Sequence, residues 1–224
     1  MRLFRMPTRP DRSERPDGIE QPHRPARTGR AAGAAVLGLG LLAAGALITA
    51  PTASSHGYTD TPISRQKLCA NKTVSDCGPI QWEPQSAEGP KGFPALGPSD
   101  GTICAAGHPE FAQLDQPRGG AWPATSVSAG QGYSFRWQFT ANHATTDIKY
   151  YVTKNGWDPS RPLTRSALDL QPFLTVAYNG ARPAMTTVHQ GAMPSGKTGR
   201  HMILAVWTVH DTPMAFYSCS DVQF

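Results

Sequence analysis

The sequence predicts an all-β protein, an antiparallel β-sandwich of the immunoglobulin or fibronectin type III kind with a long loop region that carries short helices. Two observations support this fold class. From Tyr133 onward, short apolar or alternating runs are separated by turns containing Gly or Pro, as in antiparallel sandwiches. Between Ser64 and Gly132 that pattern is absent and Pro and Gly are frequent, which is typical of a functional loop region.

Five runs in the second half of the chain are predicted strands. The first alternates apolar and polar residues, which is typical of a half-buried strand, and places Trp137 in the core. Asn-Gly turn signals follow the second and third runs. The fourth is nearly continuous in apolar residues, as expected of a central strand. The runs are YSFRWQFTA (133–141), IKYYVTK (148–154), FLTVAY (173–178), MILAVWTV (202–209) and FYSCSDVQF (216–224).

The first 55 residues have the layout of a secretory signal peptide. Eight arginines precede an uncharged run at 31–50, and small residues follow at Ala53-Ser54-Ser55. We expect cleavage after Ser55, leaving residues 56–224 as one extracellular domain of 169 residues. The alternative is an uncleaved membrane anchor, but the run is weakly hydrophobic and no basic cluster follows it.

Removing the leader changes the charge of the protein. The chain has 21 basic and 16 acidic residues. The leader holds eight of the basic and four of the acidic residues, so the mature domain keeps 13 basic and 12 acidic residues. The mature domain is therefore nearly neutral, and the basic balance gives no reason to expect a nucleic-acid partner.

All four cysteines lie after the leader: Cys69, Cys77, Cys104 and Cys219. An even count in an exported chain predicts two disulfides. Cys69 and Cys77 are close enough to close a small loop, which leaves Cys104 for Cys219. A zinc site would need paired C-x2-C spacing, which is absent.

Cleavage after Ser55 would make His56 the first residue, with two possible metal ligands: its α-amino group and its imidazole. One more imidazole would complete three nitrogens in a plane, a geometry that suits Cu(II). His143 is a candidate because it follows the first predicted strand. The remaining histidines of the mature chain are expected at the surface or in loops: His108, His189, His201 and His210.

Four blocks of the mature chain resemble bacterial lytic polysaccharide monooxygenases of auxiliary activity family 10, once described as chitin-binding proteins. They are spread over the whole domain, and the EPQS-x-EG block beside a leader cut before His is the most specific. The blocks are HG (56–57), QWEPQSAEGPKGFP (81–94), TANHATTDIKYYVTKNGW (140–157) and AVWTVHDTPMAFYSCSDV (205–222).

The resemblance implies roles for individual residues. His56 and His143 would bind one copper ion per chain. Ala141 and Phe216 would crowd its two axial faces, and Glu88 would position the oxygen species. A flat substrate surface would be formed by Trp82, Glu83, Pro84, Thr145 and Asp211. The chain departs from the family pattern at two positions. Many members have a polar residue where this chain has Met214, and Arg where it has Asn142.

Other interpretations of these residues are open. Glu83 and Glu88 could be solvated carboxylates or a hydrolase acid–base pair, and Trp82 could anchor a loop.

The resemblance implies a secreted copper enzyme that cleaves crystalline chitin oxidatively at C1. It would act as a monomer, free of any membrane after cleavage, with a small-molecule or protein electron donor and O2 or H2O2. Cellulose is the alternative substrate. The other hypotheses are a non-catalytic chitin-binding protein and a structural sandwich with an uncut leader.

Overall fold

A computed structural model describes residues 55–224, so the predicted signal peptide lies outside the described residues except for Ser55. Within this described part, no helix is long and apolar enough to cross a membrane. The elements in chain order are β1 His56–Thr61, α1 Arg65–Ala70, η1 Gly78–Gln81, β2 Glu88–Pro90, η2 Pro109–Leu114, η3 Arg118–Gly120, β3 Thr125–Ser126, β4 Gly132–Ala141, β5 Thr145–Thr153, η4 Arg165–Ala167, β6 Leu168–Ala177, β7 Thr186–Ala192, β8 Arg200–Val209 and β9 Met214–Gln223.

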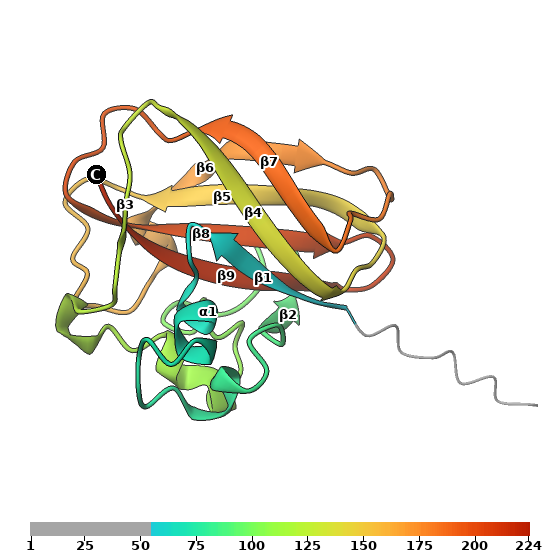
Figure 1. Cartoon of the computed structure of the whole chain (residues 1–224), viewed down its shortest axis with the longest axis horizontal. Helices are drawn as coiled ribbons and strands as arrows, with labels where there is room; N and C mark the ends of the chain where they lie inside the picture. The colour runs from blue at the N-terminus through green and yellow to red at the C-terminus, as the bar shows by residue number, and fades with distance from the viewer. Residues whose placement is uncertain (1–54) are drawn as a thin grey trace, which may run out of the picture. The chain divides into compact units, whose positions relative to one another are not determined.

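The strands form two sheets that pack into a sandwich (Figure 1). The smaller sheet has the order β1-β4-β7, and the larger has the order β2-β9-β8-β5-β6. All of these neighbours are antiparallel, and the short β3 pairs with β9 in parallel. The predicted all-β sandwich with short helices in the loop region is therefore confirmed.

All five predicted strands are present, as β4, β5, β6, β8 and β9, with boundaries shifted by a few residues. Four further strands were not predicted: β1, β2, β3 and β7. Their sequences are short or mostly polar, with no clear period of two, so pairing with their neighbours makes them strands.

The larger sheet is buried on both faces, which explains the continuous apolar run in β8. Ile203 and Trp207 belong to the core between the two sheets. Met202 and Leu204 belong to a second core on the opposite face, shared with the loop region. Because neighbouring residues of a strand point to opposite faces, a strand covered on both sides needs apolar residues at nearly every position.

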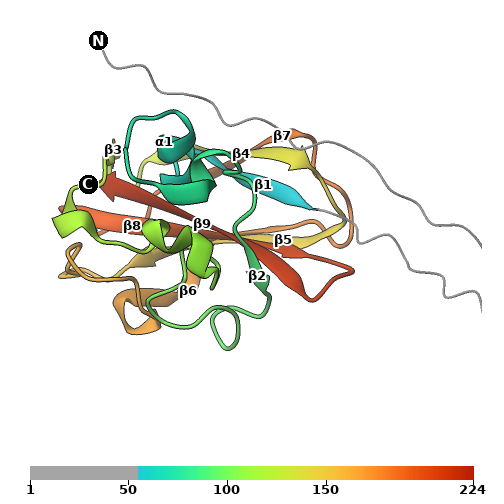
Figure 2. The same cartoon turned by 90° about the horizontal axis from the view of Figure 1, so that it is seen from below.

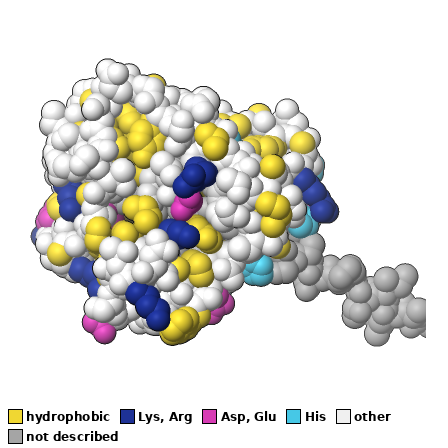
Figure 3. Space-filling model, viewed as in Figure 1, with side chains coloured by type: hydrophobic (Ala, Val, Ile, Leu, Met, Phe, Trp, Pro, Cys, Tyr) yellow, Lys and Arg dark blue, Asp and Glu magenta, His cyan; other side chains and the backbone are white. Residues whose placement is uncertain are grey.

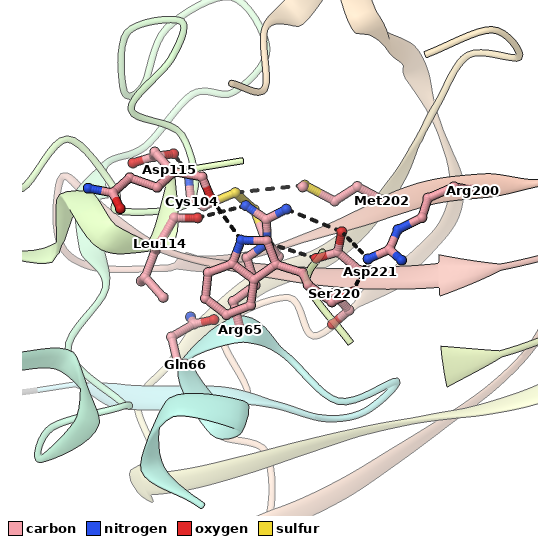
Figure 4. A network of polar contacts seen from close by, with 12 residues as sticks. Arg65, Gln66, Cys104, Leu114, Asp115, Arg200, Met202, Ser220 and Asp221 are labelled. Atoms are coloured by element: carbon pink, nitrogen blue, oxygen red, sulfur yellow. Dashed lines mark hydrogen bonds and ion pairs between the residues drawn. A yellow bond between two sulfur atoms is a disulfide. The ribbon is translucent and has the colours of Figure 1, made fainter. Parts of the chain in front are cut away.

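The loop region covers the outer face of the larger sheet, and Figure 2 shows its short helices lying over β8 and β9. A buried ion pair fastens it there. The Arg65 guanidinium of α1 donates to both carboxylate oxygens of Asp221 in β9, at 2.7 and 3.2 Å, and to the carbonyl of Leu114 at 2.8 Å (Figure 4). It also stacks 4.7 Å from the Trp122 ring centroid. Charged groups buried in this way are stable only when paired, so the contacts hold the loops in one arrangement.

Two disulfides confirm the predicted pairing. Cys69–Cys77 closes a loop with a sequence separation of 8, and Cys104–Cys219 joins the loop region to β9 with a separation of 115.

Candidate metal centre

His56 and His143 come to the same end of the sandwich through the pairing of β1 with β4. His56 lies opposite Ala141, the last residue of β4. His143 follows two residues later, in the turn before β5 begins at Thr145. Histidine side chains reach the surface at the end where the described chain begins (Figure 3). The register of β1 with β4 therefore makes neighbours of three predicted site residues, His56, Ala141 and His143.

The His143 side chain is buried and lies beside Asp211, but one of its ring nitrogens makes no hydrogen bond. It is 5% exposed. Its Nδ1 lies 2.9 Å from Oδ1 of Asp211, whose side chain is 54% exposed. This contact does not have hydrogen-bond geometry, and Nδ1 has no hydrogen-bond partner among residues 55–224. A buried ring nitrogen without a hydrogen bond is costly in a protein interior, so this imidazole is suited to a further partner such as a metal ion.

Thr145 does not lie on a substrate surface, and that prediction is wrong. Its side chain is fully buried. The hydroxyl donates to the His143 carbonyl at 2.9 Å and accepts the Trp207 indole N–H at 2.8 Å. Thr145 therefore supports the backbone of His143 from inside the core.

Phe216 packs beside His56. It is fully buried, its ring centroid lies 6.4 Å from that of His56, and the rings meet edge to face at 65°. On its other side it stacks on Trp207 at 4.6 Å. An aromatic ring fixed by this stacking places a rigid apolar wall beside His56.

Glu88 begins β2 and lies opposite Phe216 in the pairing with β9. Its side chain is half-buried. Burial raises the pKa of the Glu88 carboxyl, and the positive charges of His108 and His143 oppose that rise. The influence of His143 on this pKa makes Glu88 a candidate neighbour of the histidine pair.

The segment from Trp82 to Pro84 is fastened to the residue after His56. The Gly57 N–H donates to the Gln85 carbonyl at 3.2 Å. Trp82 is 71% exposed, with the Lys72 ammonium 5.2 Å from its ring centroid, while Glu83 and Pro84 are half-buried. The exposed indole is free to contact a partner on the side away from Lys72.

The loop that carries Asp211 is held by Lys91, which sequence reasoning did not single out. The Lys91 ammonium donates to the Thr212 carbonyl at 2.5 Å, and its backbone N–H donates to the Pro213 carbonyl at 3.0 Å. No motif signals such a contact, because it depends on how two distant loops meet.

The other histidines divide into two pairs. His108 is partly exposed and His210 is exposed, as predicted. His189 and His201 are buried, so the prediction that they lie at the surface or in loops is wrong. Neighbouring hydroxyl and carbonyl groups make this burial possible, because both ring nitrogens of each histidine are hydrogen-bonded.

The donor set fits a copper ion. Two imidazoles on adjacent chain segments are nitrogen ligands of the kind Cu(II) prefers. An apolar ring closes one side, and a carboxyl with a raised pKa stands near the other groups.

Residues 56–222 match the family model described as lytic polysaccharide mono-oxygenase, cellulose-degrading. A curated relative, the AA10 family lytic polysaccharide monooxygenase C of Mycosarcoma maydis, is 48% identical over 76% of this chain and 52% of its own length. GlcNAc-binding protein A of Shewanella oneidensis is 42% identical over 82% of this chain and 38% of its own length. The chain thus spans about half or less of the length of these curated relatives.

Solved structures match over almost their full length. An AA10 lytic polysaccharide monooxygenase from Streptomyces lividans has a TM-score of 0.74 and 66% identity, covering 75% of this chain and 100% of its own. A Bacillus amyloliquefaciens CBM33 protein in complex with Cu(I) has a TM-score of 0.69 and 37% identity, covering 75% and 99%.

Proposed function

This chain belongs to the family 10 lytic polysaccharide monooxygenases, and we propose that it is a secreted enzyme that cleaves crystalline chitin at C1 with one copper ion. The observation that carries the proposal is the register of β1 with β4, which pairs His56 with Ala141 and so sets it beside His143. A solved structure with similar sequence and fold holds Cu(I), which supports copper as the metal.

We propose that His56 and His143 hold the copper ion. Cleavage after Ser55 gives His56 a free amine, so that one residue supplies two nitrogens and His143 supplies the third. A copper ion held there would supply redox chemistry toward O2 or H2O2, with electrons from an external donor.

The remaining residues of the site orient and protect this chemistry. Phe216 would exclude water from the side of a bound ion that it faces, and Ala141, opposite His56 in the strand pairing, would lie near the ion. The Glu88 carboxyl can hold a proton at a higher pH than an ordinary glutamate, because burial raises its pKa. It is therefore suited to donate a hydrogen bond to an oxygen species near the metal.

We propose that Trp82, Glu83, Pro84 and Asp211 form the substrate surface. The exposed indole of Trp82 offers a flat apolar face for the C–H face of a sugar ring. Relatives named GlcNAc-binding protein A support chitin, whose sugar is N-acetylglucosamine. The family model that the chain matches is described as cellulose-degrading, which makes cellulose the alternative substrate.

The name of those relatives also favours a second candidate, a chitin-binding protein without catalysis. It predicts adhesion to chitin that needs neither copper nor a reductant.

Product analysis separates these functions. Copper-loaded protein beginning at His56 is incubated with β-chitin or cellulose, with and without ascorbate, and soluble products are identified by mass spectrometry. We expect aldonic-acid chito-oligosaccharides only with ascorbate, and none from His143→Ala. Oxidised products from cellulose alone would overturn the chitin assignment, and chitin binding without products would favour the second candidate.

A further inference from the structure

His108 contacts the backbone of Glu88 from a segment twenty residues further along the chain. Its Nε2 lies 2.6 Å from the Glu88 carbonyl oxygen, and its Nδ1 lies 3.1 Å from a carboxylate oxygen of Glu110. Both acceptors are satisfied when both ring nitrogens carry hydrogen, that is, in the imidazolium form. Hydrogen bonds from a charged donor are stronger than those from a neutral one.

The turn before His108 aims its imidazole at β2. Ala106 and Gly107 have positive φ values of 57° and 88°, which reverse the chain directly before His108. The ring then lies 5.5 Å from that of Phe111, which is buried. The Cys104–Cys219 disulfide fixes the start of this turn to β9. The position of the imidazole is therefore set by the fold.

Gly89 allows β2 to approach this turn closely. A Cβ atom at Gly89 would lie 2.4 Å from the Ala106 carbonyl oxygen, which is too close for any other residue type. Glycine at this position keeps Glu88 within reach of the imidazole.

Glu88 and His108 also line one open cavity of about 510 Å³, together with Met214 and Thr102. His108 thus stands on the side of Glu88 that faces this cavity. The positive charges of His108 and His143 both lower the pKa of Glu88 against the effect of burial.

We propose that His108 is a positioning residue for Glu88. Its imidazole lies between the Glu88 carbonyl and the Glu110 carboxylate and so holds the backbone that carries the Glu88 side chain. The inference rests on the proposed function only for the catalytic importance of Glu88, since the contacts themselves belong to this chain.

The first test measures Glu88 without metal or turnover. Carboxyl carbons of the metal-free protein beginning at His56 are titrated by NMR. His108→Ala is expected to raise the pKa of Glu88, because one of its two positive neighbours is lost. The control is His210→Ala, which removes another exposed histidine that bonds Thr146 and leaves Glu88 untouched. An unchanged Glu88 pKa in His108→Ala overturns the inference.

The second test is a double-mutant cycle on the rate of oxidised product release. We expect His108→Ala to lower the rate roughly tenfold, as for other residues that orient groups around a metal, and His108→Gln to restore most of it by keeping an amide donor. In a Glu88→Ala background, His108→Ala should cause no further loss. Copper affinity should stay unchanged in every variant, and thermal unfolding checks that each variant remains folded at the assay temperature.

The outcomes separate the inference from the proposed function. Additive losses of Glu88→Ala and His108→Ala would mean that His108 does not act through Glu88 and would overturn the inference. Absence of oxidised products from the wild-type protein would overturn the proposed function, and the NMR titration would then decide the placement of Glu88 alone.

Discussion

Thr145 illustrates how a single residue can be near a site without facing the substrate. The resemblance to the family places Thr145 on the substrate surface. Its hydroxyl instead bridges the His143 carbonyl and the Trp207 indole inside the core. The direction of a side chain at the start of a strand depends on register, which the local sequence does not fix.

Substitution of Thr145 by Val is expected to reduce stability without weakening chitin binding. The change keeps the shape but leaves the Trp207 N–H buried without an acceptor, which costs about 1–3 kcal/mol. Chemical denaturation measures this loss. Thr145→Ser keeps the hydroxyl and should retain most of the stability, while a large loss of chitin binding in a stable Val variant would restore the surface interpretation.

The candidate site was predictable residue by residue only where the resemblance supplied a motif. The sequence blocks that carry the resemblance include His56, His143, Phe216 and Glu88, which all belong to the candidate site. The His108 contact with Glu88 carries no sequence signal, because it depends on a positive-φ turn and on close approach at Gly89.

At the scale of elements, strands with strong apolar patterns were predictable, and strands defined by their partners were not. β8 is apolar along its length because both of its faces are covered. β7, with the sequence TTVHQGA, is an edge strand with few apolar residues. The histidine in it was predicted at the surface because the strand itself was not recognised.

That histidine, His189, links the two sheets. Its Nδ1 is hydrogen-bonded to the Tyr150 hydroxyl of β5 at 2.7 Å, and its Nε2 is hydrogen-bonded to the Tyr178 hydroxyl at 2.7 Å. The Tyr150 hydroxyl also accepts the Trp137 indole N–H at 3.1 Å. Burial lowers the pKa of His189 from 6.5 to about 4.

The stability of the domain is therefore expected to fall as the pH falls from about 6.5 to about 4. In this window the unfolded chain binds a proton at His189 that the folded chain does not, so acid favours unfolding. Denaturation in guanidinium across this range measures the effect. His189→Gln removes the titrating group, so the free energy of unfolding should vary less steeply with pH, by the equivalent of up to one bound proton. An identical pH dependence in the two proteins would contradict this prediction.

For the whole molecule, the long disulfide and the buried Arg65–Asp221 pair hold the loop region on the outer face of the larger sheet. The sequence predicted the existence of this region and both disulfides. Its folded course could not be predicted, because it has no periodic pattern and is fixed by contacts far apart in the chain.

Loss of Cys104–Cys219 is expected to destabilise the domain more than loss of Cys69–Cys77. In the chain-entropy account, the longer loop restricts the unfolded chain more, by about 2 kcal/mol. The paired serine variants Cys104→Ser/Cys219→Ser and Cys69→Ser/Cys77→Ser can be compared by thermal unfolding. Equal losses, or a greater loss for the short loop, would contradict the prediction.

In the proposed site, cleavage before His56 creates one of the copper ligands, so a residue left in front of His56 should remove that ligand. Isothermal titration with Cu(II) compares the chain beginning at His56 with a chain that keeps Ser55 in front of it. The two differ by one residue and keep both imidazoles. We predict that the extra serine weakens copper binding by at least tenfold, because the amine is displaced from the imidazole of His56. Equal affinity for copper in the two proteins would contradict the account.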